Sequence, residues 1–145
     1  MKKLKWQPPY DKNGKTNFRA AKNRTGVYLI RENGKIVYIG NSGYDLYKTM
    51  YRHFQWWQHH AQTVISYQSR LKKKKYTVRI VYCTPKQARY LERALIVKHK
   101  PRDNSVKYAL YNQDYTKAEI KYEQNVIDTY EELEVSPDYN YGLPF

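Results

Sequence analysis

The chain has 145 residues, and its 27 lysines and arginines exceed its 13 aspartates and glutamates by a formal net charge of +14. This length is typical of one domain with its own core, and the charge favours a polyanionic partner such as nucleic acid, with a solvated basic face as the alternative. The single cysteine excludes an internal disulfide. No apolar run approaches the ~20 residues of a membrane span. The basic N-terminus is not followed by the apolar region of a signal peptide. We therefore expect a soluble, cytoplasmic protein that binds no membrane.

The charge is distributed unevenly along the chain. Residues 1–106 carry 24 Lys and Arg against 5 Asp and Glu, whereas residues 107–145 carry 3 against 8. We therefore predict a basic N-terminal extension at residues 1–24, a compact domain at 25–106, and an acidic, tyrosine-rich C-terminal extension at 107–145. Weak periodicity at the end of the chain predicts only partial order there.

A β-hairpin is predicted at the start of the compact domain. Residues 25–31 and 36–40 are rich in β-formers. Asn33-Gly34 between them is the strongest short signal for a hairpin turn, because both central residues must adopt positive φ.

The hairpin carries two tyrosines, Tyr28 and Tyr38. Because residues two apart in a strand share a face, Tyr28 is expected to lie with Ile30, and Tyr38 with Ile36. The two phenols either decorate the sheet or face one cleft and act there.

A first helix is predicted from Asp45, a suitable N-cap, to His60. Its apolar positions recur at helical spacing, which predicts a stripe facing the core. These positions are Leu46, Met50, Phe54 and Trp57.

A third strand is predicted at residues 76–83, followed by a helix that ends before Pro101. Thr84 is the predicted N-cap, with Pro85 at the first helical position and Gln87 completing a capping box.

Glu92 lies on the apolar side of this second helix, four residues from both Ala88 and Ile96. A carboxylate on the inner side of a helix must be paired or must hold a cation. Two interpretations are open: an ion pair with Arg89, with Arg93 or with a buried partner elsewhere, or a hard oxygen ligand for Mg²⁺ in a phosphate-cutting site.

Four segments, in this order, resemble motifs of the GIY-YIG endonuclease family. They are GVY at 26–28, YIG at 38–40, YRHF at 51–54, and LERALIVKHKPRDN at 91–104, with Glu92 at the ligand position and Pro101 and Asn104 closing the module. The resemblance covers roughly residues 25–106. It implies an α+β fold with a small three-stranded antiparallel sheet flanked by helices.

The resemblance also implies that water hydrolyses a phosphodiester, with one Mg²⁺ or Mn²⁺ ion held by Glu92. Tyr28 would orient or deprotonate the water, and Tyr38 would hydrogen-bond the phosphate or the metal-bound water. A phenol with a pKa of ~10 is a weak base at neutral pH, so cations must lower that pKa if Tyr28 is to act. The alternative is that both tyrosines only pack against a helix.

The sequence departs from the family at two positions. Thr49 stands where the family has an arginine on the first helix, and Asn41 stands where some members have a lysine. Arg52, nearly one turn after Thr49, could reach the phosphate instead. His53 is either a proton donor to the leaving oxygen or a helix residue that contacts the sheet.

These residues support two functions. The first is a metal-dependent endonuclease, structure-directed or weakly sequence-specific, with DNA favoured over RNA by family precedent. The second is a catalytically impaired nucleic-acid-binding module of the same fold.

Further candidate contacts with nucleic acid lie outside the motif tyrosines. A basic cluster ahead of the third strand is either a sequence-blind phosphate contact or a solvated charge run, and Asn104 of the closing motif is a second candidate. Trp56 and Trp57 could stack on unpaired bases or cover the core, whereas His59 and His60 are expected to be exposed. The basic cluster consists of Lys72, Lys73, Lys74 and Lys75.

Overall fold

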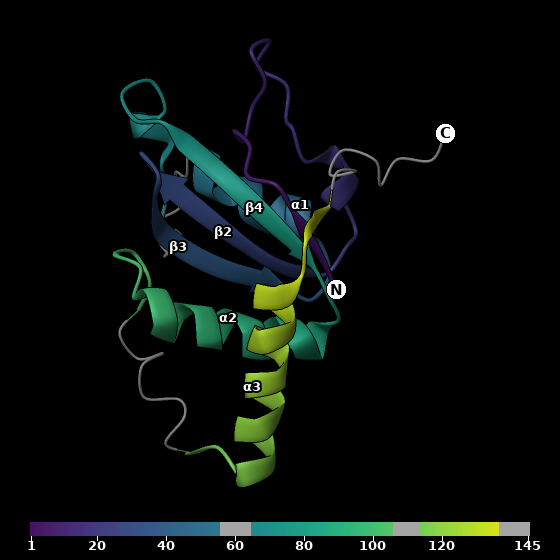
Figure 1. Cartoon of the computed structure of the whole chain (residues 1–145). Coiled ribbons are helices and arrows are strands. Elements are labelled where there is room, and N and C mark those ends of the chain that lie inside the picture. The colour runs from purple at the N-terminus through teal and green to yellow at the C-terminus, as the bar shows by residue number, and fades with distance from the viewer. Residues whose placement is uncertain (56–64, 106–113, 137–145) are drawn as a thin grey trace.

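The computed structural model describes residues 1–55, 65–105 and 114–136, which form one five-stranded sheet with helices on both faces. The strands run in the order β3-β2-β4-β1-β5 (Figure 1). They are β1 (Lys2–Leu4), β2 (Gly26–Glu32), β3 (Lys35–Ser42), β4 (Tyr76–Tyr82) and β5 (Val135–Ser136). The helices are α1 (Leu46–Tyr51), α2 (Pro85–His99) and α3 (Lys117–Glu132), with 3₁₀ turns η1 (Arg19–Ala21), η2 (Arg52–Phe54) and η3 (Gln68–Arg70).

The α+β class is confirmed, but the prediction of a three-stranded antiparallel sheet is wrong. Strands β3, β2 and β4 are antiparallel as expected. β1 then pairs antiparallel with β4, and β5 pairs parallel with β1, which makes the sheet mixed. The reason is that an open β4 edge would leave a row of unpaired backbone groups, and short strands from residues 1–24 and 107–145 cover it.

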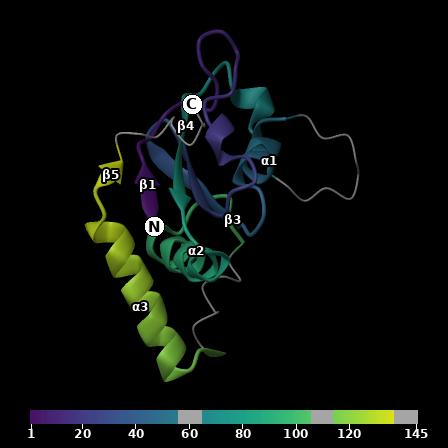
Figure 2. The ribbon, with the colours of Figure 1, turned by 90° about the vertical axis from the view of Figure 1, so that its right-hand side faces the viewer.

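The sheet separates two hydrophobic clusters. On one face, Leu46 and Met50 of α1 pack with Tyr28 and Ile30 of β2. On the other face, α2 packs against β2 and β3, and α3 lies beside α2 (Figures 1 and 2). Among the residues that the structure describes, no helix is both long and apolar enough to cross a membrane.

The β2–β3 hairpin contains an irregularity that the alternation rule misses. Its turn is as predicted, with φ of 51° at Asn33 and 84° at Gly34. The register then shifts, so that Tyr38 pairs with Ile30 but Ile36 pairs with Arg31.

This β-bulge corrects one prediction about the tyrosines. The extra residue, Val37, reverses the side-chain alternation along β3. Tyr38 therefore packs against the cluster that holds Tyr28, whereas Ile36 packs on the opposite face. Both phenols consequently lie on the α1 side of the sheet.

The first helix is shorter than predicted. Asp45 caps it, and Leu46, Met50 and Phe54 are buried as expected. Helix α1 nevertheless ends at Tyr51 and η2 follows, because the carbonyl of His53 accepts the N–H of Tyr67 at 2.7 Å. The predictions for Trp56, Trp57, His59 and His60 fall outside the described residues.

Helix α2 begins and ends as the sequence predicts. Thr84 and Gln87 form the capping box, with Pro85 in the first turn. Lys100, in the left-handed conformation at φ 44°, ends the helix before Pro101.

Polar contacts attach α3, which begins with its own capping box, to α2. The buried guanidinium of Arg93 forms an ion pair with Glu123, and the hydroxyl of Tyr90 donates to Glu119 at 2.9 Å. The acidic C-terminal region thus contains a packed helix, which the sequence analysis did not predict. The predicted partial order concerns residues 131–145, most of which lie outside the described residues.

Glu123→Gln should lower the free energy of unfolding by about 3 kcal/mol, because it leaves a buried guanidinium without its counter-charge. Glu131→Gln is the matched control, since its pair with Lys98 is nearly half exposed, and it should cost less than about 1 kcal/mol. Urea denaturation measures both, and equal losses in the two variants would show that the Arg93 pair does not hold α3.

Candidate active site

A cavity of about 210 Å³ lies beside β3, the edge strand of the sheet. Its lining comes from four elements that are far apart in the sequence, namely β2, β3, the α1–η2 segment and α2. The structure brings together every residue that the sequence predicts for catalysis or metal binding. The lining consists of Tyr28, Tyr38, Gly40, Asn41, Thr49, Arg52, His53 and Glu92.

Gly40 allows the phenol of Tyr28 to reach this edge. The two residues face each other across β2 and β3. A Cβ atom on Gly40 would overlap the hydroxyl oxygen and ring carbons of Tyr28. Gly40 therefore has no side chain because the ring of Tyr28 occupies that space.

The hydroxyl of Tyr28 lies 2.9 Å from Nε2 of His53. The other ring nitrogen, Nδ1, lies 2.8 Å from the carbonyl oxygen of Ile65, to which it can only donate. This assigns the tautomer of the neutral ring: Nδ1 carries the proton, and Nε2 accepts the hydrogen bond from Tyr28.

Burial keeps His53 neutral. It lowers the pKa of His53 to about 4, and the charge of Arg52 acts in the same direction, while the hydrogen bond to Ile65 opposes them. Of the two roles predicted for His53, contact with the sheet is observed, because its ring meets Tyr28 of β2; the role of proton donor to the leaving oxygen stays a prediction. The imidazole is placed to accept a proton from Tyr28.

The pKa of both active-site tyrosines is raised. Burial, then Tyr38 and Glu92, hold the pKa of Tyr28 well above its usual value, and burial and Glu92 raise the pKa of Tyr38. Arg52 opposes the shift at both phenols. Both phenols are therefore protonated at neutral pH, and their ring centroids lie 6.2 Å apart.

Glu92 is 8% exposed and makes no ion pair within the described part of the chain. Burial raises the pKa of its carboxyl group to about 7, and a hydrogen bond with Asn41 opposes that shift. Arg93 is paired with Glu123, and the guanidinium of Arg89 lies over Tyr90 at 5.3 Å. Neither Arg89 nor Arg93 therefore forms the ion pair with Glu92 that was the predicted alternative.

The donor set of the cavity fits a divalent cation. The described residues contain no cluster of three His, Cys, Asp or Glu side chains. One carboxylate with an amide beside it suits Mg²⁺, which keeps several waters and is commonly held by one or two carboxylates together with substrate phosphate oxygens.

The cationic group of the cavity comes from Arg52 at the start of η2. Thr49, at the position where the resemblance implies an arginine, lines the same cavity, and its hydroxyl donates to Oγ of Ser42 at 3.2 Å. That position is therefore uncharged in this chain, and Arg52 supplies positive charge from nearly one turn further along.

The other predicted contacts lie outside the cavity. The basic cluster Lys72–Lys75 is exposed in the turn before β4. The backbone N–H of Lys75 donates a hydrogen bond to the side-chain oxygen of Asn33. The amide of Asn104 both accepts from and donates to the backbone of Ile39 at 2.9 Å. Asn104 thus fastens the edge strand beside the site.

Sequence reasoning missed the roles of Gly40 and Asn41. The signal for both is local: Gly40 is the glycine of the YIG motif, and Asn41 is the residue after it. A scan against protein-family models finds no match for this chain, and a search of curated proteins finds none. The functional interpretation therefore rests on the site itself.

Gly40→Ala should displace the phenol of Tyr28 from His53 and lower the free energy of unfolding by about 1–3 kcal/mol, the usual cost of overpacking. Gly43→Ala is the matched control, because its added Cβ would lie 4.0 Å from Pro85, an ordinary contact. Denaturation and the ¹⁵N chemical shift of His53 Nε2 test the change. An unchanged shift in Gly40→Ala would contradict the proposed packing.

Proposed function

We propose that this chain is a divalent-metal-dependent endonuclease of the GIY-YIG type that hydrolyses phosphodiester bonds of nucleic acid. The observation that carries the proposal is the placement of Glu92, a buried carboxylate that forms no ion pair among the described residues, in one cavity with Arg52 and the Tyr28–His53 pair. These groups match what phosphodiester hydrolysis requires: a metal ligand, a cation for the phosphate, and a route for a proton.

In this proposal, Glu92 holds one Mg²⁺ or Mn²⁺ ion, with Asn41 beside it. The ion, when bound, acts as a Lewis acid on the phosphate and on water. Its charge also removes the repulsion by which Glu92 raises the pKa of both phenols.

The Tyr28–His53 hydrogen bond provides a route for the proton of the attacking water. The water gives its proton to the phenol oxygen of Tyr28 while the phenol proton passes to Nε2 of His53. Tyr28 therefore never has to exist as a free phenolate, which its raised pKa disfavours. The negative charge that enters with the phosphate raises the pKa of His53 and helps it to hold the proton.

Arg52 and Tyr38 are the groups available to the phosphate. Arg52 lies near enough to both phenols to act on their pKa, so a phosphate beside them would be in range of its guanidinium. Preorganised cations that face developing charge are usually among the largest contributions to catalysis. The hydroxyl of Tyr38 can donate a hydrogen bond to a phosphate oxygen.

A nucleic-acid-binding module without turnover is the second candidate, favoured by the uncharged Thr49. It gives no account of Glu92, whose negative charge repels phosphate in the absence of a metal. A panel of branched, single-stranded and duplex DNA, and of RNA, separates the two functions. Cleavage in Mg²⁺ or Mn²⁺ that stops in EDTA supports the nuclease, whereas binding without cleavage in any metal supports the module.

Glu92→Gln should abolish metal-dependent cleavage. Binding of nucleic acid in EDTA should persist or tighten, because the substitution removes one negative charge from the site that receives the phosphate. Added Mg²⁺ should raise the melting temperature of the wild type only. Glu132→Gln, the same change on the exposed face of α3, is the control for charge and should cleave normally. A Glu92→Gln variant that cleaves at the wild-type rate contradicts the assigned role.

The same variant makes a prediction for the pH dependence of stability. The carboxyl of Glu92 has a folded pKa of about 7, above its unfolded value, so the stability it contributes at pH 4 is lost as the pH rises through 7. Without metal, Glu92→Gln should match the wild type at pH 4 and exceed it at pH 8 by up to about 3 kcal/mol. Urea denaturation at the two pH values measures the difference, and a destabilised variant at pH 8 would indicate a buried ion pair instead.

Arg52→Ala should reduce the cleavage rate by about 100-fold or more, the usual effect of losing a group that stabilises transition-state charge, while binding in EDTA weakens far less. Lys121→Ala on α3 removes the same charge from the other side of the sheet and should leave cleavage unchanged. Single-turnover rates and binding isotherms give the comparison. Equal losses in rate and affinity would make Arg52 only a phosphate anchor.

A further inference from the structure

A second cavity, lined largely by residues at the start of α1, lies next to the candidate active-site cavity. It has a volume of about 610 Å³ and shares Arg52 with the active-site cavity. Two lysines and two tyrosines that the proposed chemistry does not use form much of its lining. We call it the tyrosine groove, and these residues are Lys22, Tyr44, Tyr47 and Lys48.

The electrostatics of the tyrosine groove suit a polyanion. Lys22, Lys48 and Arg52 supply positive charge, and the groove contains one carboxylate, Asp45. That carboxylate accepts the backbone N–H of Lys48 at 3.1 Å as the N-cap of α1. The negative charge of the groove is thus engaged by the helix terminus, and three cationic side chains remain in its lining.

The lining of the groove also includes a solvent-exposed aromatic ring, that of Tyr44. Tyr44 is 62% exposed, the most exposed large hydrophobic residue in the described part of the chain. Its backbone is nevertheless fixed, because the N–H groups of Tyr44 and Asp45 both donate to Oγ of Ser42, at 3.3 and 2.9 Å. A fixed backbone lowers the entropic cost of stacking a ligand on the ring.

Tyr47 forms a second aromatic surface in the groove. Its hydroxyl lies 3.0 Å from that of Thr16, and Nζ of Lys22 lies 4.9 Å from its ring centroid. A cation beside an anchored ring offers a phosphate contact next to a stacking surface, which is the combination that single strands of nucleic acid require.

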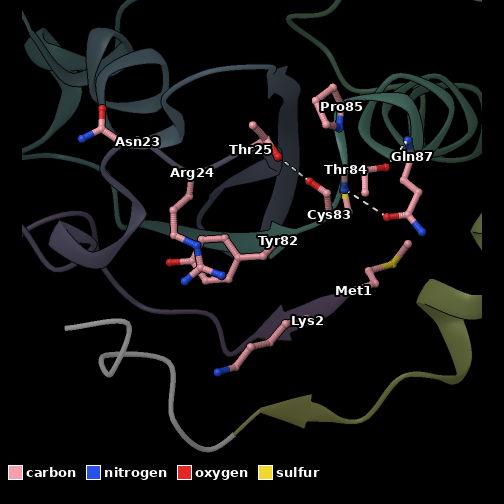
Figure 3. Close-up of a pocket in the computed structure, with 10 residues that line it drawn as sticks. All are labelled: Met1, Lys2, Asn23, Arg24, Thr25, Tyr82, Cys83, Thr84, Pro85 and Gln87. Carbon is pink, nitrogen blue, oxygen red and sulfur yellow. Dashed lines mark hydrogen bonds between the residues drawn. The ribbon is translucent and has the colours of Figure 1, made fainter. Parts of the chain in front are cut away.

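A further cavity, of about 560 Å³, adjoins the groove at Asn23, which lines both (Figure 3). There the guanidinium of Arg24 stacks on the ring of Tyr82 at 3.6 Å, with Lys2 nearby. Arg24 forms no ion pair with a carboxylate in the described residues. The tyrosine groove shares Arg52 with the active-site cavity and Asn23 with this one, and each of the three cavities has a cationic side chain in its lining. We call these three cavities together the path.

We propose that this path binds an unpaired strand of nucleic acid that leads to the active site, and that Tyr44 stacks on one of its bases. The inference rests on the proposed function and specifies its substrate class: nucleic acid with a single-stranded segment at the cleavage site. In a duplex, the bases stack on one another and their faces are closed to a protein ring. An exposed, fixed tyrosine beside a chain of cations therefore fits an unpaired strand, because every base has a face on which it can stack.

The test compares three fluorescent probes of equal length in EDTA: an oligothymidylate, an abasic oligomer with the same number of phosphates, and a duplex. Tyr44→Ala should weaken binding of the oligothymidylate about tenfold or more, the usual effect of losing one base–aromatic stack. Affinity for the abasic oligomer and for the duplex should be unchanged. Tyr44→Phe, which keeps the ring, should bind all three probes like the wild type.

Two further variants separate stacking from charge and from general surface effects. Lys22→Gln combined with Lys48→Gln should weaken binding of the oligothymidylate and the abasic oligomer equally and should flatten the salt dependence of both. Ile120→Ala, on an exposed side chain of α3, should change none of the affinities. Melting temperatures establish that each variant folds.

Equal losses for the thymidylate and abasic probes in Tyr44→Ala, or no loss for either, would overturn the inference. Because binding is measured without metal, failure of the proposed function is recognised separately. A chain that binds oligothymidylate through Tyr44 but cleaves nothing contradicts the nuclease and supports the binding path. A chain that cleaves unpaired strands at the same rate with and without the ring of Tyr44 contradicts the path alone.

Discussion

The passage of the Tyr28 phenol over Gly40 is the contact on which the site depends. It brings a side chain of β2, the neighbouring strand, to the open edge of the sheet, where His53 meets it from η2. Glu92 approaches the same edge on α2, which packs on the opposite face. Residues from both faces can therefore share one cavity only because the edge strand is bare at this position.

Burial has opposite effects on the two titrating groups of the cavity, yet leaves both with less charge. It lowers the pKa of His53 to about 4 and raises that of Glu92 to about 7. In this strongly cationic protein, burial thus favours the neutral forms of both His53 and Glu92. In the proposed function, the charge differences that hydrolysis needs arrive with the metal ion and the phosphate, beside the guanidinium of Arg52.

The features that the sequence predicts correctly are those set by local chemistry. The Asn33-Gly34 turn, the capping box of α2 and the burial of Glu92 each depend on residues within a few positions. The end of α1 and the addition of β1 and β5 depend on partners farther along the chain, and the bulge at Val37 depends on how β3 pairs with β2. Periodicity carries no information about such partners, so the shared face of Tyr28 and Tyr38 could not be derived from spacing alone.

The two outermost strands set the order in which the chain can complete its fold. β1 holds residues near the beginning of the sequence, but its neighbours β4 and β5 come much later, and the β1–β5 pair joins Lys3 to Val135. Contacts of such high sequence separation form late, because closing a long loop costs entropy before any contact compensates for it. On the ribosome, β3, β2 and β4 can assemble first, and β1 must wait for partners that have not yet been made. The sheet edge opposite the candidate site is consequently the last part of the sheet to form.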